Sequence, residues 1–139
     1  MKHALLIPLC SLCLCGQSFA GFAAGGLNAV DATNAIVGEA AGAPYLVKLG
    51  VADALHNRAA ELRRPLKGVY GFRSPVTRHS AKSVWQDAAK AWLESARHHV
   101  VSGALYFGNA DDVRKGAFAG LHLTVILGTG KSATYFFKP

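Results

Sequence analysis

Cysteine is scarce in this chain, and its few copies gather in one place. The sequence holds 3 cysteines among 139 residues, namely Cys10, Cys13 and Cys15. If the segment that carries them is removed, the remainder has no thiol, which excludes disulfides, a cysteine nucleophile and a thiolate metal site together. That lack is typical of a protein placed in an oxidising compartment outside the cytoplasm.

Charged residues are also few, and acidic ones are the rarer kind. They make up 17% of the chain against 51% hydrophobic residues, and this apolar content excludes a disordered or fibrous protein. The 15 Lys and Arg outnumber the 8 Asp and Glu, which gives a formal charge of +7. A basic surface favours an anionic partner such as cell-wall polymer, anionic lipid or nucleic acid, and charge alone does not choose among them.

Only the N-terminus carries a long hydrophobic run. Lys2 precedes the apolar residues 4–15, and residues 18–20 (SFA) place small side chains where a signal peptidase reads them. A membrane span needs about 20 apolar residues, so this shorter run predicts export to the periplasm, the cell wall or the exterior, without stable membrane insertion once the segment is cleaved. The alternative is an uncleaved segment that anchors the protein. The expected organisation is a signal peptide over residues 1–20, a flexible leader over 21–27 and one domain over 28–139.

Apolar residues recur every three or four positions in three segments, which predicts three helices. Asn28 or Asp31 can cap the first, which should end near Ala41. The second should run from Pro44 to shortly before Pro65. Ser80 can cap the third, which carries two tryptophans that we assign to the core, Trp85 and Trp92.

The second helix is predicted to be half-buried. Leucines and alanines form one stripe along it, whereas the charged residues fall elsewhere: Lys48, Asp53, Arg58 and Glu61. After it, residues 68–77 have the glycine and proline content of a loop.

Beyond residue 103 the period changes to that of strands. Residues 103–107, 121–127 and 133–137 are strand-like, and Gly128, Thr129 and Gly130 indicate a hairpin between the last two. Helices followed by a small antiparallel sheet predict an α+β domain.

Glu39 is the most informative polar residue. It shares a helix face with Ala32, Ala35 and Ile36, so we expect its carboxyl group to face the core. Burial disfavours ionisation of a carboxyl group, and a general acid must hold its proton near neutral pH. The alternative is a structural glutamate, bonded to a neighbouring helix or paired with an arginine such as Arg58. Gly38 beside it would admit either a ligand or a close helix contact.

Four segments resemble the motifs of one enzyme family in their order and spacing. They are residues 35–45 (AIVGEAAGAPY), 50–58 (GVADALHNR), 103–109 (GALYFGN) and 135–138 (YFFK). Together they resemble the spore cortex-lytic enzyme (SleB-type) family of cell wall hydrolases. The resemblance spans roughly residues 31 to 138.

The resemblance implies a lysozyme-like fold that cleaves peptidoglycan glycan strands between N-acetylmuramic acid and N-acetylglucosamine, usually as a lytic transglycosylase. It places the family's catalytic glutamate on Glu39. Such an enzyme works with one carboxyl group, which protonates the leaving oxygen and then takes a proton from the substrate's C6 hydroxyl. A hydrolase would normally need a second carboxylate. Six residues are candidates for it: Asp53, Glu61, Asp87, Glu94, Asp111 and Asp112.

Aromatic faces and amides suit sugars, although an aromatic residue in a small domain is as often core. Asn57 and Arg58 would either line the groove or tie helices together, and we favour the structural role. The predicted substrate-binding residues are Asn57, Arg58, Tyr70, Tyr106 and Asn109.

We expect no cofactor and no metal. Residues 128–132 (GTGKS) end like a phosphate-binding loop, but too little chain follows for the required helix, and the histidines lack a metal-ligand spacing. The expected partner is peptidoglycan rather than nucleic acid, bound by a monomer. Two alternatives stay open: a wall-binding module without catalysis, and a basic protein that acts on anionic membranes.

Overall fold

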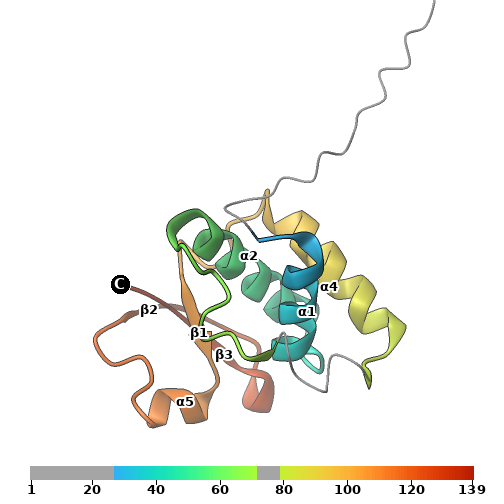
Figure 1. Cartoon of the computed structure of the whole chain (residues 1–139). Helices are drawn as coiled ribbons and strands as arrows, with labels where there is room; N and C mark the ends of the chain where they lie inside the picture. Colours follow the sequence, from blue (N-terminus) through green and yellow to red (C-terminus); the bar gives the residue numbers. More distant parts are fainter. Residues whose placement is uncertain (1–26, 72–78) are drawn as a thin grey trace, which may run out of the picture.

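The computed structural model describes residues 27–71 and 79–139 (Figure 1). The predicted signal peptide with its cysteines, most of the leader and much of the predicted 68–77 loop lie outside the described residues. Within them, helices come first and a small antiparallel sheet follows, which confirms the α+β prediction.

The three predicted helices are α1 (Ala29–Ala40), α2 (Tyr45–Glu61) and α4 (Lys82–Ser95). Asn28 caps α1, where its side-chain oxygen accepts a hydrogen bond from the Asp31 amide at 2.8 Å. Pro44 holds the N-cap position of α2. At α4 the N-cap is Ala81, whose backbone is extended, so the prediction of Ser80 as the cap is wrong by one residue.

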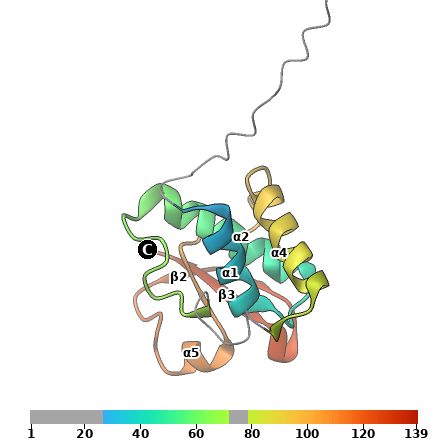
Figure 2. The same cartoon turned by 45° about the vertical axis from the view of Figure 1, so that its right-hand side comes forward.

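The prediction of a half-buried second helix is wrong. α2 lies at the centre of the molecule, in contact with α1, α4 and the sheet (Figure 2). Most of its stripe is buried, and so are three of its polar residues: Lys48, Asp53 and Arg58. Each buried polar side chain has a partner: Lys48 lies 3.3 Å from Asp87, and Asp53 accepts from the Val101 amide at 2.9 Å. Polar positions therefore do not mark a solvent face when other elements supply hydrogen bonds.

The sheet contains β1 (Tyr106–Gly108), β2 (His122–Leu127) and β3 (Thr134–Lys138) in the order β1-β3-β2, with both pairs antiparallel. β2 and β3 form the predicted hairpin, whose turn includes the 3-10 helix η3 (Gly130–Ser132). Phe136 of β3 is fully buried and packs toward Gly50 of α2, where an added Cβ would meet its ring. This contact fixes the sheet against the central helix.

Small residues allow the helices to approach closely. Ala32, Ala35, Ala88 and Ala91 are fully buried in the core shared by α1, α2 and α4. Trp92 is also buried there, as predicted, with Trp85 packed against the same cluster. In the described ranges, none of the helices is both long and apolar enough to cross a membrane.

Candidate active site

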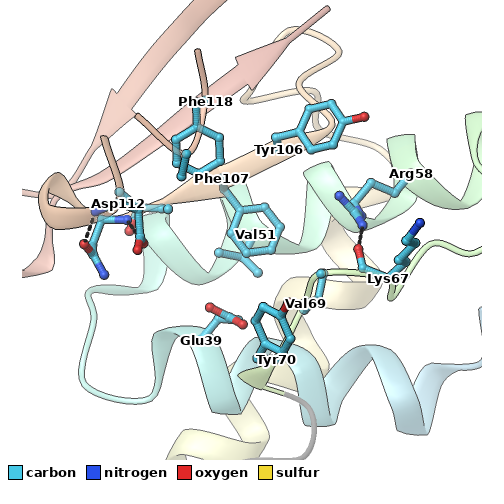
Figure 3. A pocket seen from close by; sticks show the side chains of 15 residues that line it. Glu39, Val51, Arg58, Lys67, Val69, Tyr70, Tyr106, Phe107, Asp112 and Phe118 are labelled. Atoms are coloured by element: carbon cyan, nitrogen blue, oxygen red, sulfur yellow. Dashed lines mark hydrogen bonds between the residues drawn. The ribbon is translucent and has the colours of Figure 1, made fainter. Parts of the chain in front are cut away.

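A pocket of about 410 Å³ opens where α1 ends, between the helices and the sheet (Figure 3). Its walls come from α1, α2, residues 67–70, β1, the short helix α5 (Ala110–Arg114) and the turn after it. The predicted site residues that line it are Glu39, Arg58, Tyr70, Tyr106 and Asn109.

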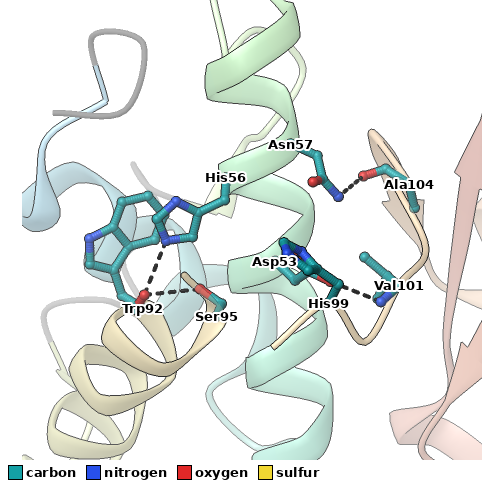
Figure 4. A network of polar contacts seen from close by, with 8 residues as sticks. All are labelled: Asp53, His56, Asn57, Trp92, Ser95, His99, Val101 and Ala104. Atoms are coloured by element: carbon teal, nitrogen blue, oxygen red, sulfur yellow. Dashed lines mark hydrogen bonds and ion pairs between the residues drawn. The ribbon is translucent and has the colours of Figure 1, made fainter. Parts of the chain in front are cut away.

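Asn57 is the predicted site residue that does not line this pocket. Its side-chain amide donates to the Ala104 carbonyl at 3.1 Å and so ties α2 to the segment before β1 (Figure 4). This contact is the structural role that we favoured for Asn57.

Glu39 is exposed, so the prediction that its carboxyl group faces the core is wrong. It does share a helix face with the buried Ala32, Ala35 and Ile36. It lies in the last turn of α1, however, where that face borders the pocket instead of packed side chains. Helix periodicity gives the direction of a side chain but not what lies opposite that turn.

A backbone amide fixes one oxygen of the Glu39 carboxyl group. The Gly71 N–H donates to Glu39 Oε1 at 2.7 Å. This contact holds the side chain at the side of the pocket and leaves Oε2 without a hydrogen bond from the rest of the described chain. The alternative of a Glu39–Arg58 pair is not seen, because Arg58 donates to carbonyl groups instead.

Two glycines make this amide contact possible. A Cβ added at Gly38 would overlap the Gly71 carbonyl, and one added at Gly71 would lie 2.7 Å from Glu39 Cγ. Gly38 therefore makes a close contact with the backbone of Gly71 in the chain after α2, rather than with a neighbouring helix. The contact brings the chain after α2 against α1 and delivers the Gly71 N–H to the carboxyl group.

Arg58 both lines the pocket and ties elements together. Its side chain donates to the carbonyl groups of Pro65, Lys67 and Leu105, the last at 2.8 Å. These bonds fix the chain after α2 and the start of β1. The residue is only 4% exposed, and this burial lowers the pKa of its guanidinium.

Aromatic and apolar surfaces form much of the remaining wall. Tyr70 is 83% exposed at the pocket, and the Tyr106 ring lies 5.5 Å from Arg58 Cζ. Val51 and Phe107 line the pocket between the charged side chains (Figure 3). Such surfaces suit the apolar faces of a sugar ring.

Asn109 caps a helix that the sequence reading missed. Its side-chain oxygen accepts from the amides of Asp111 at 2.7 Å and Asp112 at 3.0 Å, while Asp112 Oδ2 accepts from the Asn109 amide at 3.1 Å. This reciprocal capping box starts α5, a helix that the periodicity of the sequence does not predict. The Asn-x-x-Asp spacing was the signal available in the sequence.

Asp112 is the only candidate for a second carboxylate that lines the described pocket with Glu39. Of the others, Asp53 is buried beside Val101, and Glu61 lies at the end of α2. The remaining three have partners elsewhere: Asp87 with Lys48, Glu94 with Tyr45, and Asp111 with Arg114.

Several residues that line the pocket were not predicted from the sequence. Phe118 follows α5 in a stretch without periodicity, and its ring stacks on Phe137 with the centroids 4.5 Å apart. Gly108 was assigned only to the strand and loop motif, but an added Cβ there would meet both Phe118 and Asp112. Val69, Lys67 and Thr134 had no sequence signal, since only the fold brings them to the pocket.

No family model, curated protein or solved structure matches the chain. The resemblance to SleB-type cell wall hydrolases stays a prediction.

Proposed function

We propose that this protein cleaves the glycan strand of peptidoglycan between N-acetylmuramic acid and N-acetylglucosamine, with Glu39 as acid and base. One observation carries the proposal: a carboxyl group, oriented by a backbone amide, lies at a pocket with aromatic walls. The order and spacing of the motifs that resemble SleB-type hydrolases support the same substrate.

The two oxygens of the Glu39 carboxyl group have different roles in the proposed reaction. Oε1 accepts from the Gly71 N–H, so Oε2 is available to give its proton to the bridging oxygen of the glycan. Because Glu39 is exposed in the free protein, exclusion of water around it has to come from the bound strand. The bond from C1 to the bridging oxygen then breaks, and the leaving sugar departs as an alcohol.

Completion of the reaction requires a nucleophile at C1. In a lytic transglycosylase the C6 hydroxyl of the same muramic acid bonds to C1 and returns its proton to Glu39, which closes a 1,6-anhydro ring. A hydrolase would instead activate water through a second carboxylate. Asp112 is at hand, but its Oδ2 is bonded to the Asn109 amide in the capping box. The transglycosylase reaction needs Glu39 alone.

The first experiment compares the purified protein and its Glu39→Gln variant on purified peptidoglycan. We expect soluble muropeptides from the wild type and a loss of at least about 100-fold in the variant, the scale of general acid catalysis. The side-chain amide introduced by Glu39→Gln can still accept from the Gly71 N–H, so the pocket of the variant should be intact. Glu61→Gln is the matched control, since Glu61 is exposed and does not line the pocket.

Mass spectrometry of the products separates the mechanisms. Anhydro-muramoyl ends support the transglycosylase reaction, whereas reducing ends would assign water as the nucleophile and Asp112 as the residue to substitute next. If neither product forms and both proteins still sediment with the wall, the enzymatic proposal is wrong and the pocket serves binding alone. Association with anionic vesicles that survives Glu39→Gln, without muropeptides, would likewise contradict it.

A further inference from the structure

We infer that the end of the pocket formed by Arg58 and Lys67 binds a carboxylate carried by the saccharide. The inference rests on the proposed function for the identity of the saccharide. It adds a requirement that the proposed function does not contain: an acidic group on the ligand, away from the bridging oxygen that Glu39 protonates.

The charges of the pocket are separated in space. Glu39 of α1 and Asp112 of α5 lie toward one side in Figure 3, and Arg58 and Lys67 lie toward the other. Val51 lies between them in this view. A ligand with a neutral reacting bond at one end and an anionic group at the other would match this arrangement.

Arg58 is a buried cation without a carboxylate partner. The ion pairs among residues 27–71 and 79–139 leave it out, although it is only 4% exposed. Burial of a charge is costly unless an opposite charge or strong hydrogen bonds compensate. A guanidinium has five N–H groups, and three of them bond to the carbonyls of Pro65, Lys67 and Leu105. No group among the described residues accepts from the other two N–H groups, so we assign them to the anion.

Lys67 brings a second cation to the same end. Its own carbonyl accepts from Arg58, so the two residues are linked through the backbone. Its side chain is exposed and makes no hydrogen bond or ion pair within the described part of the chain. The ammonium group is therefore free to follow a ligand into the pocket, and it is a site where charge can be removed without disturbing a structural contact.

Carboxylate is the anion that the proposed substrate supplies. A muramic acid without a peptide carries a lactyl carboxylate, and a muramic acid with a peptide carries carboxylates on that stem. A strand of N-acetylglucosamine alone is neutral and carries neither. The Arg58–Lys67 end therefore selects muramoyl saccharides from neutral ones, with either source of the carboxylate.

The test measures binding by calorimetry in the full-length Glu39→Gln protein, which prevents cleavage during the titration. The ligands are three tetrasaccharides: alternating N-acetylglucosamine and N-acetylmuramic acid with free lactyl groups, the same sugar with stem peptides, and the neutral chitotetraose. The same titrations are then repeated with a protein that combines Lys67→Gln with Glu39→Gln. Lys131→Gln is the matched control, since Lys131 is exposed and does not line the pocket.

We expect an acidic tetrasaccharide to bind about tenfold or more tightly than chitotetraose, the effect of one hydrogen bond to a charged group. Lys67→Gln should reduce the ratio of the chitotetraose dissociation constant to that of the acidic sugar severalfold, and Lys131→Gln should leave this ratio unchanged. If the sugar with free lactyl groups binds more tightly than chitotetraose, the lactyl carboxylate is the bound group. If only the sugar with stem peptides binds more tightly, the bound group is a carboxylate of the peptide. Equal binding of acidic and neutral sugars, or a ratio insensitive to Lys67→Gln, overturns the inference alone. Failure of all three sugars to bind overturns it together with the proposed substrate.

Discussion

The Gly38–Gly71 contact decides where the Glu39 carboxyl group points. Gly38→Ala would place a methyl group on the Gly71 carbonyl, so the chain after α2 must move away and the Gly71 N–H must leave Glu39 Oε1. We expect the free energy of unfolding to fall by about 1–3 kcal/mol, typical of overpacking. Cleavage should fall more than about tenfold, because the carboxyl group loses its orientation.

Gly42→Ala is the matched control for this substitution. It lies just beyond the end of α1, and nothing is within 4 Å of an added Cβ. Its unfolding and cleavage should match those of the wild type. Wild-type cleavage by a folded Gly38→Ala protein would show that the Gly71 amide does not position Glu39.

The Tyr45–Glu94 hydrogen bond gives a pH-dependent contribution to stability. The Tyr45 hydroxyl donates to Glu94 Oε2 at 2.6 Å, and this bond lowers the pKa of Glu94 below its ordinary 4.5. Burial, together with the same bond and nearby carboxylates, raises the pKa of Tyr45. A lowered acid pKa stabilises the folded state above the unfolded-state pKa, and this stability is lost as pH falls through the folded-state value.

Tyr45→Phe should therefore unfold at a lower temperature than the wild type at pH 7. The difference should begin to shrink as pH falls below about 4.5, where Glu94 of the unfolded chain becomes protonated, and should be lost as pH falls through the lower folded-state pKa of Glu94. Thermal unfolding followed by circular dichroism from pH 2 to about 8 measures this, with Tyr135→Phe as control, since no described group bonds its hydroxyl. A constant difference across the range would contradict a role for Glu94 ionisation.

At the scale of elements, the central position of α2 requires partners for its buried polar side chains. Lys48 is 4% exposed and pairs with Asp87, whose side chain is 49% exposed. Asp87→Ala would leave the ammonium group buried without its partner. We expect a loss of about 1–2 kcal/mol, less than for a fully buried pair because water reaches Asp87.

A double-mutant cycle with Lys48→Met tests this pair by denaturant unfolding. Lys48→Met/Asp87→Ala should recover most of the stability, because an apolar side chain of similar length then fills the site. If the double variant is as unstable as Asp87→Ala, the loss does not come from the unpaired lysine.

The elements also show where sequence patterns fail. The three long helices and the hairpin follow from periodicity and from turn residues such as Gly128, which has φ of 80°. The burial of α2 could not follow from its own pattern, because it depends on Asp87, Val101 and carbonyls from other segments. The helix α5 was missed since its five residues are too short to show a period.

At the scale of the whole molecule, the pocket joins residues that the sequence keeps far apart. Glu39, Arg58 and Asp112 come from three helices, and the fold brings them to one cavity. The formal charge of +7 in the chain says nothing of this arrangement. Two cations meet at one end of the pocket because Arg58 binds the Lys67 carbonyl.

The sequence by itself determined the α+β order, the limits of the first two helices to within a few residues, the start of the third helix, the hairpin, and Glu39 as the carboxyl group to study. These depend on local periodicity and capping, which are encoded in neighbouring residues. Only the tertiary structure decided that Glu39 is exposed, that Asn57 bonds the Ala104 carbonyl, and that Arg58 lies buried without a carboxylate partner among the described residues. Burial and partnership depend on which distant segments meet, and no local pattern contains that information.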